Sequence, residues 1–288
     1  MKITKNIRNI LFAAQLIILI CSVGGCSLAT VQIKASDKML NDNSMEKIAV
    51  FGHGKINWPR MGRGGSVLVL PDCIQATENV LAQTKKVLAK KGYEIVCADP
   101  VGVGFYSQNM WLVEDLDDWK EEKFTKIKDI RPIFVYPQFQ HDQEFDKSVL
   151  NVIGQLNLAI KENRVGSFEP DKGDIEVIHQ ATGADTICLQ RLYGKKYSTR
   201  RKIGKEFLQL LTYRKVTVED SVELLMIFID ARTGEVLWQA GESSKEENPI
   251  NPSEEFVEDV LRFFPARHET LAEKGCTKWG INVLNCKY

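Results

Sequence analysis

Cys26 is the residue whose surroundings most clearly suggest chemistry, because two glycines and an apolar run precede it. The run, ILFAAQLIILICSV at 10–23, is 14 residues long and follows a start with three basic residues and no acidic one. A membrane-spanning helix needs about 20 apolar residues, so this run is too short to be one. A short apolar run between a basic start and small residues is typical of a secretory signal. We therefore predict a signal peptide over 1–25, cut directly before a cysteine whose thiol can be modified.

The four residues Val23-Gly24-Gly25-Cys26 resemble the lipobox of bacterial lipoproteins, in which an aliphatic residue and two small ones precede a cysteine. The resemblance implies that the Cys26 thiol receives a diacylglyceryl group and that the new amino group is acylated, for example with palmitate. Two or more acyl chains hold a protein stably on a membrane. Ser27, unlike an aspartate at this place, implies sorting to the outer membrane, with the body in the periplasm. The alternative is an ordinary cleaved signal followed by a cysteine that carries no lipid.

The composition is that of an ordinary globular protein, with 44% hydrophobic and 26% charged residues in a chain of 288. The full chain has 38 basic and 38 acidic residues, and the signal holds three of the basic ones, so the mature chain has 35 against 38 and a net charge of −3. Nucleic-acid-binding proteins usually show a strong basic excess. The charge balance therefore speaks against a nucleic-acid partner.

Seven cysteines occur, and five remain once Cys21 leaves with the signal and Cys26 takes lipid. In an oxidising periplasm some of the five should pair. Cys276 and Cys286 enclose the short stretch CTKWGINVLNC and are the disulfide that we predict first.

Three cysteines lie in or near predicted strands. Cys73 and Cys97 could also pair if their strands are neighbours, and Cys188 would then be a buried free thiol, as is usual on an apolar strand. None of the cysteines has the CxxC spacing of a zinc or redox site. The four histidines, at 53, 141, 179 and 268, also lack metal-ligand spacing. No cofactor or metal is therefore predicted.

The chain divides into three parts after the signal. Residues 26–46 are polar and aperiodic, which predicts a tether of at most about 65 Å when extended. We predict an α/β domain over 47–265, an insertion in it near 99–145, and a C-terminal tail over 266–288.

The first half of the domain has a strand-helix-strand pattern. KIAVFG at 47–52 and SVLVLP at 66–71 are predicted strands, joined by a Gly-rich loop. A helix over 77–91, with lysines on its outer face, ends at Gly92 and leads to a strand over 93–98. The second strand, the helix and the third strand predict a right-handed crossover of a parallel pair.

The second half has weaker signals at first. Within the insertion we predict a helix over 113–127 and an irregular edge strand over 131–139, which contains two prolines. Clear helical patterns follow, which predict helices over 146–165 and 173–183. A strand is then predicted over 184–194.

The domain closes with a hairpin and a helix. VELLMIFID and EVLWQAG are joined by ARTG, a tight turn in which Gly234 can take positive φ, and a helix is predicted over 251–269. The predicted fold is α/β: a mixed sheet with helices on its faces and a C-terminal antiparallel hairpin. Its expected core residues are Leu68, Leu70, Ile187, Leu225, Ile227, Ile229 and Trp238.

Three stretches carry a wider resemblance: SVLVLPD with the helix after it, TGADTICLQRLYG, and IDARTGEVLWQ. Together with the lipobox they resemble envelope lipoproteins with a TolB-amino-terminal-like α/β fold, among them the curli secretion lipoprotein and outer-membrane activators of peptidoglycan synthases. The resemblance covers about residues 47–264 and brings no catalytic residues. It implies a non-enzymatic subunit of a secretion or cell-wall machine that binds an envelope protein. Assembly of the chain into a homo-oligomer is a further alternative.

The Gly-rich stretch GHGKINWPRMGRGG is a candidate phosphate-binding loop that lacks the necessary context. Such a loop leads into a helix and ends in Lys-Ser or Lys-Thr, whereas here Lys55 precedes Ile56 and a strand follows. We therefore expect this stretch to be a connection between strands.

An acidic run near position 118 supports a second hypothesis, an enzyme that acts on envelope glycan or lipid. The Gly-rich stretch and DPVGVGFYSQN would line its cleft, and Asp115 or Glu121 would act as acid or base. Acids clustered on one helix are more typical of a solvated face. The run contains Asp115, Asp117, Asp118, Glu121 and Glu122.

The stretch KKYSTRRKIGKE at 195–206 supports a third hypothesis, a protein that binds a lipid surface. Each cation near an anionic membrane adds about 1 kcal/mol of binding free energy. A solvated hairpin loop explains the same residues equally well. The candidate contacts are Lys195, Lys196, Arg200, Arg201 and Lys202.

Overall fold

A computed structural model gives the fold of the compact unit Val31–Tyr288, and the unit Met1–Thr30 lies outside its described residues. The described residues are 34–41, 44–59, 66–103, 110–113, 125–126, 134–135, 142–197, 219–273, 276–279 and 283–286. Within these ranges, no helix is both long and apolar enough to cross a membrane.

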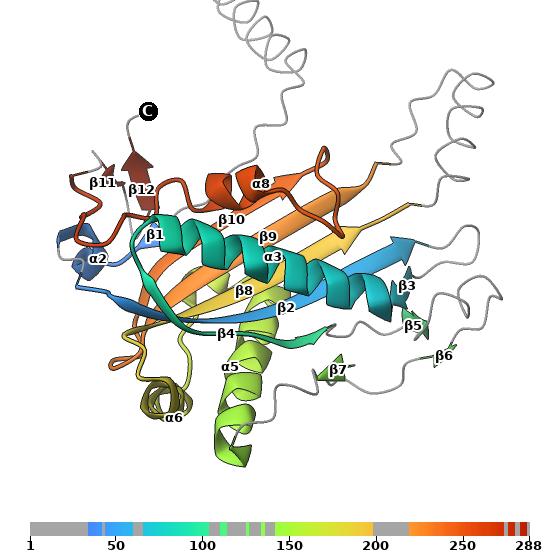
Figure 1. The fold of residues 1–288 in the computed structure, drawn as a ribbon, viewed down its shortest axis with the longest axis horizontal. Coiled ribbons are helices and arrows are strands. Elements are labelled where there is room, and N and C mark those ends of the chain that lie inside the picture. The colour runs from blue at the N-terminus through green and yellow to red at the C-terminus, as the bar shows by residue number, and fades with distance from the viewer. Residues whose placement is uncertain are drawn as a thin grey trace, which may run out of the picture. The chain divides into compact units, whose positions relative to one another are not determined.

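The longest of the described strands, β2 (Lys47–Pro59), lies between two parallel neighbours, β4 (Glu94–Val103) and β8 (Thr186–Lys195). Its residues 48–51 are fully buried, since helices cover both faces of the sheet (Figure 1). From one end of the sheet, the order of the described strands is β11-β12-β1-β10-β9-β8-β2-β3-β5-β6, and β4 pairs with β2 and β7. The parallel strands are therefore central.

Antiparallel strands complete the sheet next to β8. β9 (Ser221–Asp230) pairs with β8 and forms a hairpin with β10 (Val236–Ser244). In the turn, Gly234 has φ +75°, a conformation that favours glycine. The predicted fold class is thus confirmed: a mixed α/β sheet with an antiparallel hairpin.

Helices lie on both faces. α3 (Leu70–Lys90) and α8 (Glu254–Val260) lie on one face, and α5 (Gln143–Lys161) and α6 (Lys172–Thr182) on the other (Figure 1). A short 3₁₀ helix, η1 (Val165–Ser167), connects α5 and α6. The helices predicted over 146–165 and 173–183 are confirmed as α5 and α6.

Side-chain caps explain where three of these helices begin. Asp142, Asp171 and Ser253 each accept a hydrogen bond from a backbone N–H in the first turn, of α5, α6 and α8 respectively. At its other end, α6 closes with Gly183 at φ +65°. α8 is shorter than the helix predicted over 251–269. It begins directly after its cap, Ser253, and ends at Val260.

The lysines predicted on the outer face of α3 hold α8 in place. Lys86 and Lys90 both form an ion pair with Glu254, and the Lys90 ammonium also lies 2.8 Å from a Glu258 oxygen. Exposed ion pairs contribute little free energy each, so the pairs specify position more than stability.

Two glycines let neighbouring elements approach β2 closely. A Cβ on Gly54 would overlap the Thr77 hydroxyl of α3, and one on Gly194 would lie 2.6 Å from Ile56 Cδ1. These contacts explain why glycine is needed within strands. A Gly-rich loop was expected directly after 47–52. This prediction was wrong for the residues up to Pro59, because they belong to β2.

The predicted pairing of the crossover was also wrong. β3 (Ser66–Val69) is antiparallel to β2, and α3 joins the β2–β3 pair to β4, whose parallel partner is β2. The strand ends at Val69 because α3 begins at Leu70. Pro71 lies in the first turn of α3, where a backbone N–H would have no acceptor within the helix, so the proline is tolerated there.

Six of the seven expected core residues are buried, and Leu70 is the exception. Leu70 is half-buried because it begins α3 instead of ending a strand. The confirmed core residues are Leu68, Ile187, Leu225, Ile227, Ile229 and Trp238.

Part of the predicted tether belongs to the sheet. β1 (Lys34–Ala35) pairs with β10 and β12, and α2 (Asp37–Asn41) follows it. Ala35 and Met39 are 4% and 1% exposed, so this segment is packed into the core. Two such short elements have no periodic pattern, and the sequence therefore gave no signal for them.

The predicted tail also adds strands. β11 (Cys276–Trp279) and β12 (Val283–Cys286) form a hairpin, and β12 pairs with β1. The two ends of the described chain therefore meet in the sheet.

The insertion contributes three short strands. They are β5 (Met110–Val113), β6 (Thr125–Lys126) and β7 (Phe134–Val135). The helix expected over 113–127 was wrong at Val113, which lies in β5, and at 125–126, which form β6. The rest of that range lies outside the described residues. β7 agrees with the expected irregular strand and pairs with β4.

Replacing Gly54 with alanine should destabilise the protein, because the new methyl group overlaps the Thr77 hydroxyl. We expect a loss of about 1–3 kcal/mol in the free energy of unfolding, measured by urea denaturation of the full chain. Gly154→Ala is the control, since that site in α5 is open, and it should add about 0.5–1 kcal/mol. Equal stability of Gly54→Ala and wild type would contradict the close packing.

The backbone positions of Cys276 and Cys286 are compatible with the predicted disulfide, since the two residues lie opposite each other in the β11–β12 hairpin. Opposite residues in antiparallel strands have Cα atoms about 4.5–5.5 Å apart, a separation that a disulfide can bridge. We predict that a non-reducing digest of the chain, isolated from its host without reductant, yields the linked peptides. Cys276→Ser should lower the free energy of unfolding by about 2–3 kcal/mol. Two free thiols at these positions would refute the pairing.

Candidate functional site on the central strands

Polar side chains alternate with small or apolar ones along two neighbouring strands, HGKIN in β2 and RLYGK in β8. The two stretches are in register, so that His53 faces Arg191, Lys55 faces Tyr193 and Asn57 faces Lys195. Because side chains alternate between the faces of a strand, all six share one face. They lie toward the carboxyl ends of parallel strands, where ligands bind in open α/β sheets.

α5 packs on the same face and fixes its inner part. The rings of Phe51 and Phe145 are 5.9 Å apart between centroids, and Asn157 Nδ2 lies 3.3 Å from His53 Nε2. Burial, together with the nearby Arg191, lowers the pKa of His53 to about 3. His53 is therefore a neutral, buried residue at neutral pH.

Two cations lie beyond His53. Burial and the charge of Arg191 lower the pKa of Lys55 to about 8. Burial also lowers the pKa of Arg191, against the effect of Glu223, whose Oε1 lies 3.7 Å from Arg191 Nη1. The site therefore holds two partly desolvated positive charges close together.

Tyr193 connects the polar residues of the two strands. Asn57 Nδ2 donates a hydrogen bond of 3.0 Å to Tyr193 Oη. Arg191 Cζ and Lys195 Nζ lie 5.7 and 5.9 Å from the centre of the Tyr193 ring. These distances are typical of cation–π contacts, so the ring is close to two cations.

The predicted basic contacts do not form one patch in the described part of the chain. Lys195 and Lys196 are consecutive, and Lys196 Nζ lies 5.4 Å from the ring centre of Trp58, which is on the α3 face. Trp58 Nε1 donates to Asp72 Oδ2 at 2.8 Å, and burial raises the pKa of Asp72. Three further candidates, Arg200, Arg201 and Lys202, lie outside the described residues.

Three of the described cysteines, Cys73, Cys97 and Cys188, form no disulfide. Cys73, in α3, lies 3.2 Å from the Ile56 N–H, while the Cys97 thiol donates to Asp99 at 2.9 Å. The alternative Cys73–Cys97 disulfide was therefore wrong. Cys188 is confirmed as a buried free thiol, and burial raises the pKa of all three thiols.

Other predicted residues lie outside the described part of the chain. They include the lipidation candidate Cys26 and the whole acidic run, Asp115 to Glu122. The cleft loops expected for an enzyme begin as strands, since residues 52–59 belong to β2 and 99–103 to β4. In the ranges that the structure describes, no three metal-binding side chains converge.

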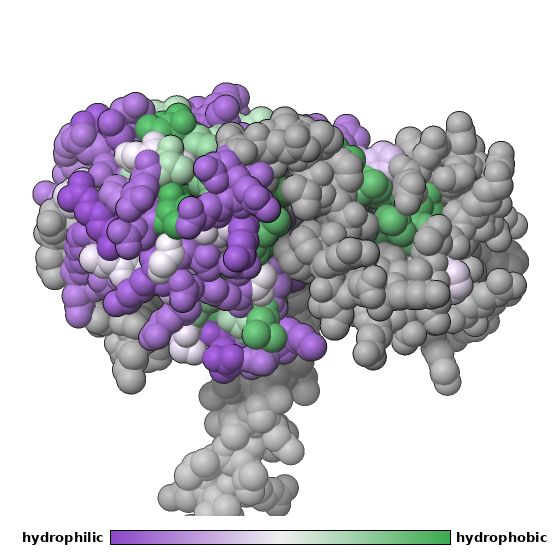
Figure 2. Space-filling view, turned by 90° about the horizontal axis from the view of Figure 1, so that it is seen from below, coloured by the Kyte–Doolittle hydropathy of each residue, from purple (hydrophilic) through white to green (hydrophobic). Residues whose placement is uncertain are grey.

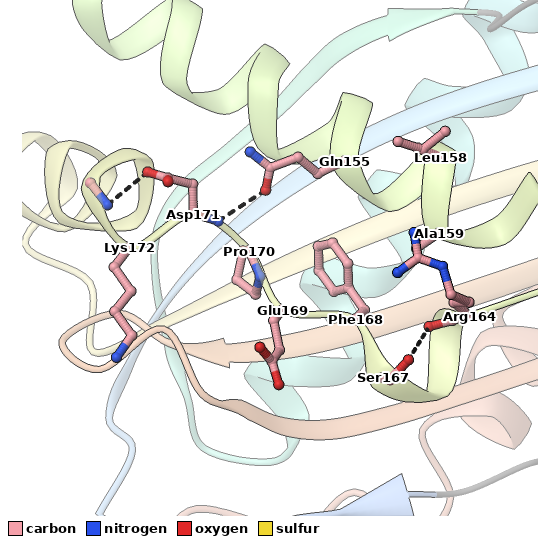
Figure 3. A pocket seen from close by; sticks show the side chains of 11 residues that line it. Gln155, Leu158, Ala159, Arg164, Ser167, Phe168, Glu169, Pro170, Asp171 and Lys172 are labelled. Carbon is pink, nitrogen blue, oxygen red and sulfur yellow. Dashed lines mark hydrogen bonds between the residues drawn. The ribbon is translucent and has the colours of Figure 1, made fainter. Parts of the chain in front are cut away.

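A shallow hollow of about 760 Å³ lies at the end of α5, with the next segment as its wall (Figure 3). Leu158, on its rim, is 51% exposed. The polar groups bond within the wall: Gln155 Oε1 accepts from the Asp171 N–H at 2.9 Å, and Ser167 Oγ donates to the Arg164 carbonyl at 3.2 Å. A second hollow of about 810 Å³ shares residues 167–170.

Hydrophilic residues predominate on the described part of the face shown in Figure 2. The hydrophobic residues there form small areas separated by hydrophilic ones. Single exposed apolar side chains are normal on a protein surface, so this face alone does not identify a docking area.

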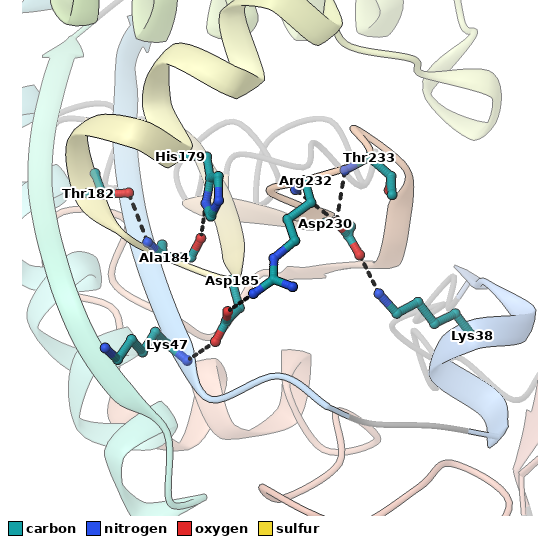
Figure 4. A network of polar contacts seen from close by, with 9 residues as sticks. All are labelled: Lys38, Lys47, His179, Thr182, Ala184, Asp185, Asp230, Arg232 and Thr233. Carbon is teal, nitrogen blue, oxygen red and sulfur yellow. Dashed lines mark hydrogen bonds and ion pairs between the residues drawn. The ribbon is translucent and has the colours of Figure 1, made fainter.

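A polar network at the opposite end of the central strands has a structural role (Figure 4). Asp230 pairs with Lys38 of α2 and accepts 2.9 Å hydrogen bonds from the N–H groups of Arg232 and Thr233. Burial alone would raise the pKa of Asp230, but these bonds lower it. Asp185 accepts from the Lys47 N–H at 3.2 Å. The network joins α2, the β9–β10 turn and the start of β2.

Comparisons with known proteins identify no family. No family model and no curated protein matches the sequence. A PelC dodecamer from Paraburkholderia phytofirmans is 10% identical, with 81% of this chain and 95% of that chain covered at a TM-score of 0.29. The lipoprotein GNA1162 from Neisseria meningitidis is 14% identical, with 75% and 94% covered and a TM-score of 0.29. Likeness at this level identifies neither a shared function nor a shared site.

Asp230 gives a prediction on stability and pH. Its folded-state pKa is lowered, so the carboxylate stabilises the fold above its unfolded pKa, and this contribution is lost as pH falls through the folded pKa. Asp230→Asn should lower the free energy of unfolding at pH 7 by about 1–3 kcal/mol. The difference from wild type should shrink below pH of about 4.

Urea unfolding at several pH values checks this prediction. Lys38→Met is the matched variant, because it removes the ion pair and leaves both backbone hydrogen bonds of Asp230. Its effect should be the smaller one. A constant difference between Asp230→Asn and wild type from pH 7 down to pH 3 would contradict the assignment.

Proposed function

We propose that the chain is a lipid-anchored protein on the periplasmic side of a bacterial outer membrane. Its folded body acts as a non-enzymatic subunit that binds another envelope protein, in a secretion or cell-wall machine. The anchor rests on the sequence Val23-Gly24-Gly25-Cys26, which has the form of a lipobox. The observation that carries the role of the body is the position of β1.

Few residues separate the predicted anchor from the folded body in the sequence. Lys34, the first residue of β1, is eight positions after Cys26, and an extended chain of that length spans at most about 29 Å. β1 is fixed, since it pairs with β10 on one side and β12 on the other. The 65 Å tether expected from the sequence is therefore replaced by a connection less than half as long.

A short connection limits which partners the body can reach. Partners in or on the same membrane are within reach, and partners across the envelope are not. Effective concentration falls as a flexible linker lengthens beyond the distance it must span. A body held this closely is suited to a stable complex at the membrane surface.

Strand addition is one way in which a partner could bind. In the strand order of the described residues, β11 lies at one end of the sheet. An edge strand offers backbone N–H and C=O groups to a strand of another chain. The partner can be another envelope protein or, in a homo-oligomer, a second copy of this chain.

Metabolic labelling with palmitate tests the anchor. Wild type should incorporate the label and fractionate with the outer membrane. Cys26→Ala should incorporate none, because the acylated thiol and the new amino group are both lost. Ser27→Ala is the control, and it should still be labelled. Label in Cys26→Ala would refute the anchor.

Crosslinking in intact cells tests the role of the short connection. Wild type should give one reproducible crosslinked envelope protein, identified by mass spectrometry. Inserting 20 Gly/Ser residues after Ser27 should reduce that crosslink several-fold, because the body then samples a larger volume. Palmitate labelling of the insertion variant shows that anchoring is intact. An unchanged crosslink, or none in wild type, would contradict the proposal.

A further inference from the structure

We infer that Arg191, Tyr193 and Lys55 form a binding site for a phosphate-type dianion. The site lies on the α5 face of the sheet, toward the carboxyl ends of β2 and β8. It does not depend on the proposed anchor or partner, and its failure would leave both untouched.

Arg191 is the central donor. Its side chain is 17% exposed, and the Glu223 oxygen at 3.7 Å is too distant for a hydrogen bond. Over the ranges that the structure describes, no acceptor is hydrogen-bonded to this guanidinium. A charged group withdrawn from water normally has hydrogen-bond partners. The five N–H groups of arginine match the oxygens of a phosphate.

Tyr193 supplies a second donor in a fixed position. Asn57 is 6% exposed and donates to Tyr193 Oη at 3.0 Å, so one lone pair of the phenol is occupied. The phenol O–H is then left to donate, and the described part of the chain gives it no acceptor. Tyr193 is two residues from Arg191 in β8, so both side chains are on the same face.

Lys55 adds charge beside these donors. It lies directly opposite Tyr193 in the register and diagonal to Arg191. Burial, and after it the repulsion between the two cations, lowers the pKa of Lys55 to about 8. A bound anion would relieve the repulsion. Two positive charges favour a dianion over a monoanion, because the attraction scales with the product of the charges.

Two further charges lie at the margin of the site. Lys195, an exposed residue, lies 5.9 Å from the Tyr193 ring centre and adds a positive charge. Glu223 opposes an anion, but its side chain is 52% exposed and therefore screened by water. Among the described residues, three cations and one carboxylate lie at the site.

The ligand class follows from these donors. A phosphate monoester has three terminal oxygens, which can accept from a guanidinium, a phenol and an ammonium group. The same chemistry occurs in lipid headgroups and in soluble phosphorylated compounds. The experiment therefore begins with the shared group and then separates the two sources.

Calorimetry with inorganic phosphate on the full chain in detergent tests the site. Wild type should bind phosphate at a constant chloride concentration. Arg191→Gln should weaken binding at least about tenfold, since it removes charge-assisted hydrogen bonds. Tyr193→Phe should weaken phosphate binding about threefold to tenfold. It should also lower stability, because the buried Asn57 amide loses its acceptor, so its binding is measured under conditions in which the variant is folded.

Arg232→Gln is the matched control, because Arg232 is 72% exposed and lies in the β9–β10 turn, at the other end of the central strands. It should bind phosphate like wild type. Absence of phosphate binding by wild type would overturn the inference. So would wild-type affinity in both Tyr193→Phe and Arg191→Gln.

Nanodiscs separate the two sources of phosphate. The full chain is titrated with inorganic phosphate in discs of phosphatidylcholine alone and in discs that also contain phosphatidic acid. If phosphatidic acid occupies the site, inorganic phosphate should bind several-fold more weakly in the second discs, and Arg191→Gln should show no such difference between the two discs. That result assigns the site to a lipid headgroup. Equal affinity in both discs assigns it to a soluble phosphorylated compound.

Discussion

The close packing of α3 on β2 is the constraint on which the rest of the structure depends. Gly54 has no side chain on the face that α3 covers, so the helix lies against the strand where Thr77 passes it. The alternate residues His53, Lys55 and Asn57 then occupy the other face. The stretch HGKIN thus specifies helix packing on one side of the sheet and a cationic site on the other.

Long periodic elements could be predicted from the sequence, and short or tertiary ones could not. α5, α6 and the β9–β10 hairpin show clear periods and turn residues, and they were confirmed. The second half of β2 was missed because Gly52 and Gly54 are typical of loops. The reason for Gly54 appears only when α3, which lies later in the chain, is placed beside it.

The candidate site could be predicted only in part. The alternation in RLYGK marks Arg191 and Tyr193 as neighbours on one face of a strand, but Lys55 is far from them in sequence. Only the register of β2 with β8 brings these residues together. Likewise, the sequence grouped Lys195 with Lys196, whereas the strand directs them to opposite faces, each beside an aromatic ring.

The two ends of the described chain meet at β1, which connects the fold to the proposed function. Since β1 lies between β10 and β12, the body begins eight residues after Cys26. Native-state hydrogen exchange over 34–41 tests this claim most directly. The account predicts that the amide of Ser36, which donates to the Leu237 carbonyl at 2.9 Å, is protected to a similar degree as the amides of β10. Exchange over 34–41 at the rate of an unstructured peptide would contradict it, and would restore a long tether.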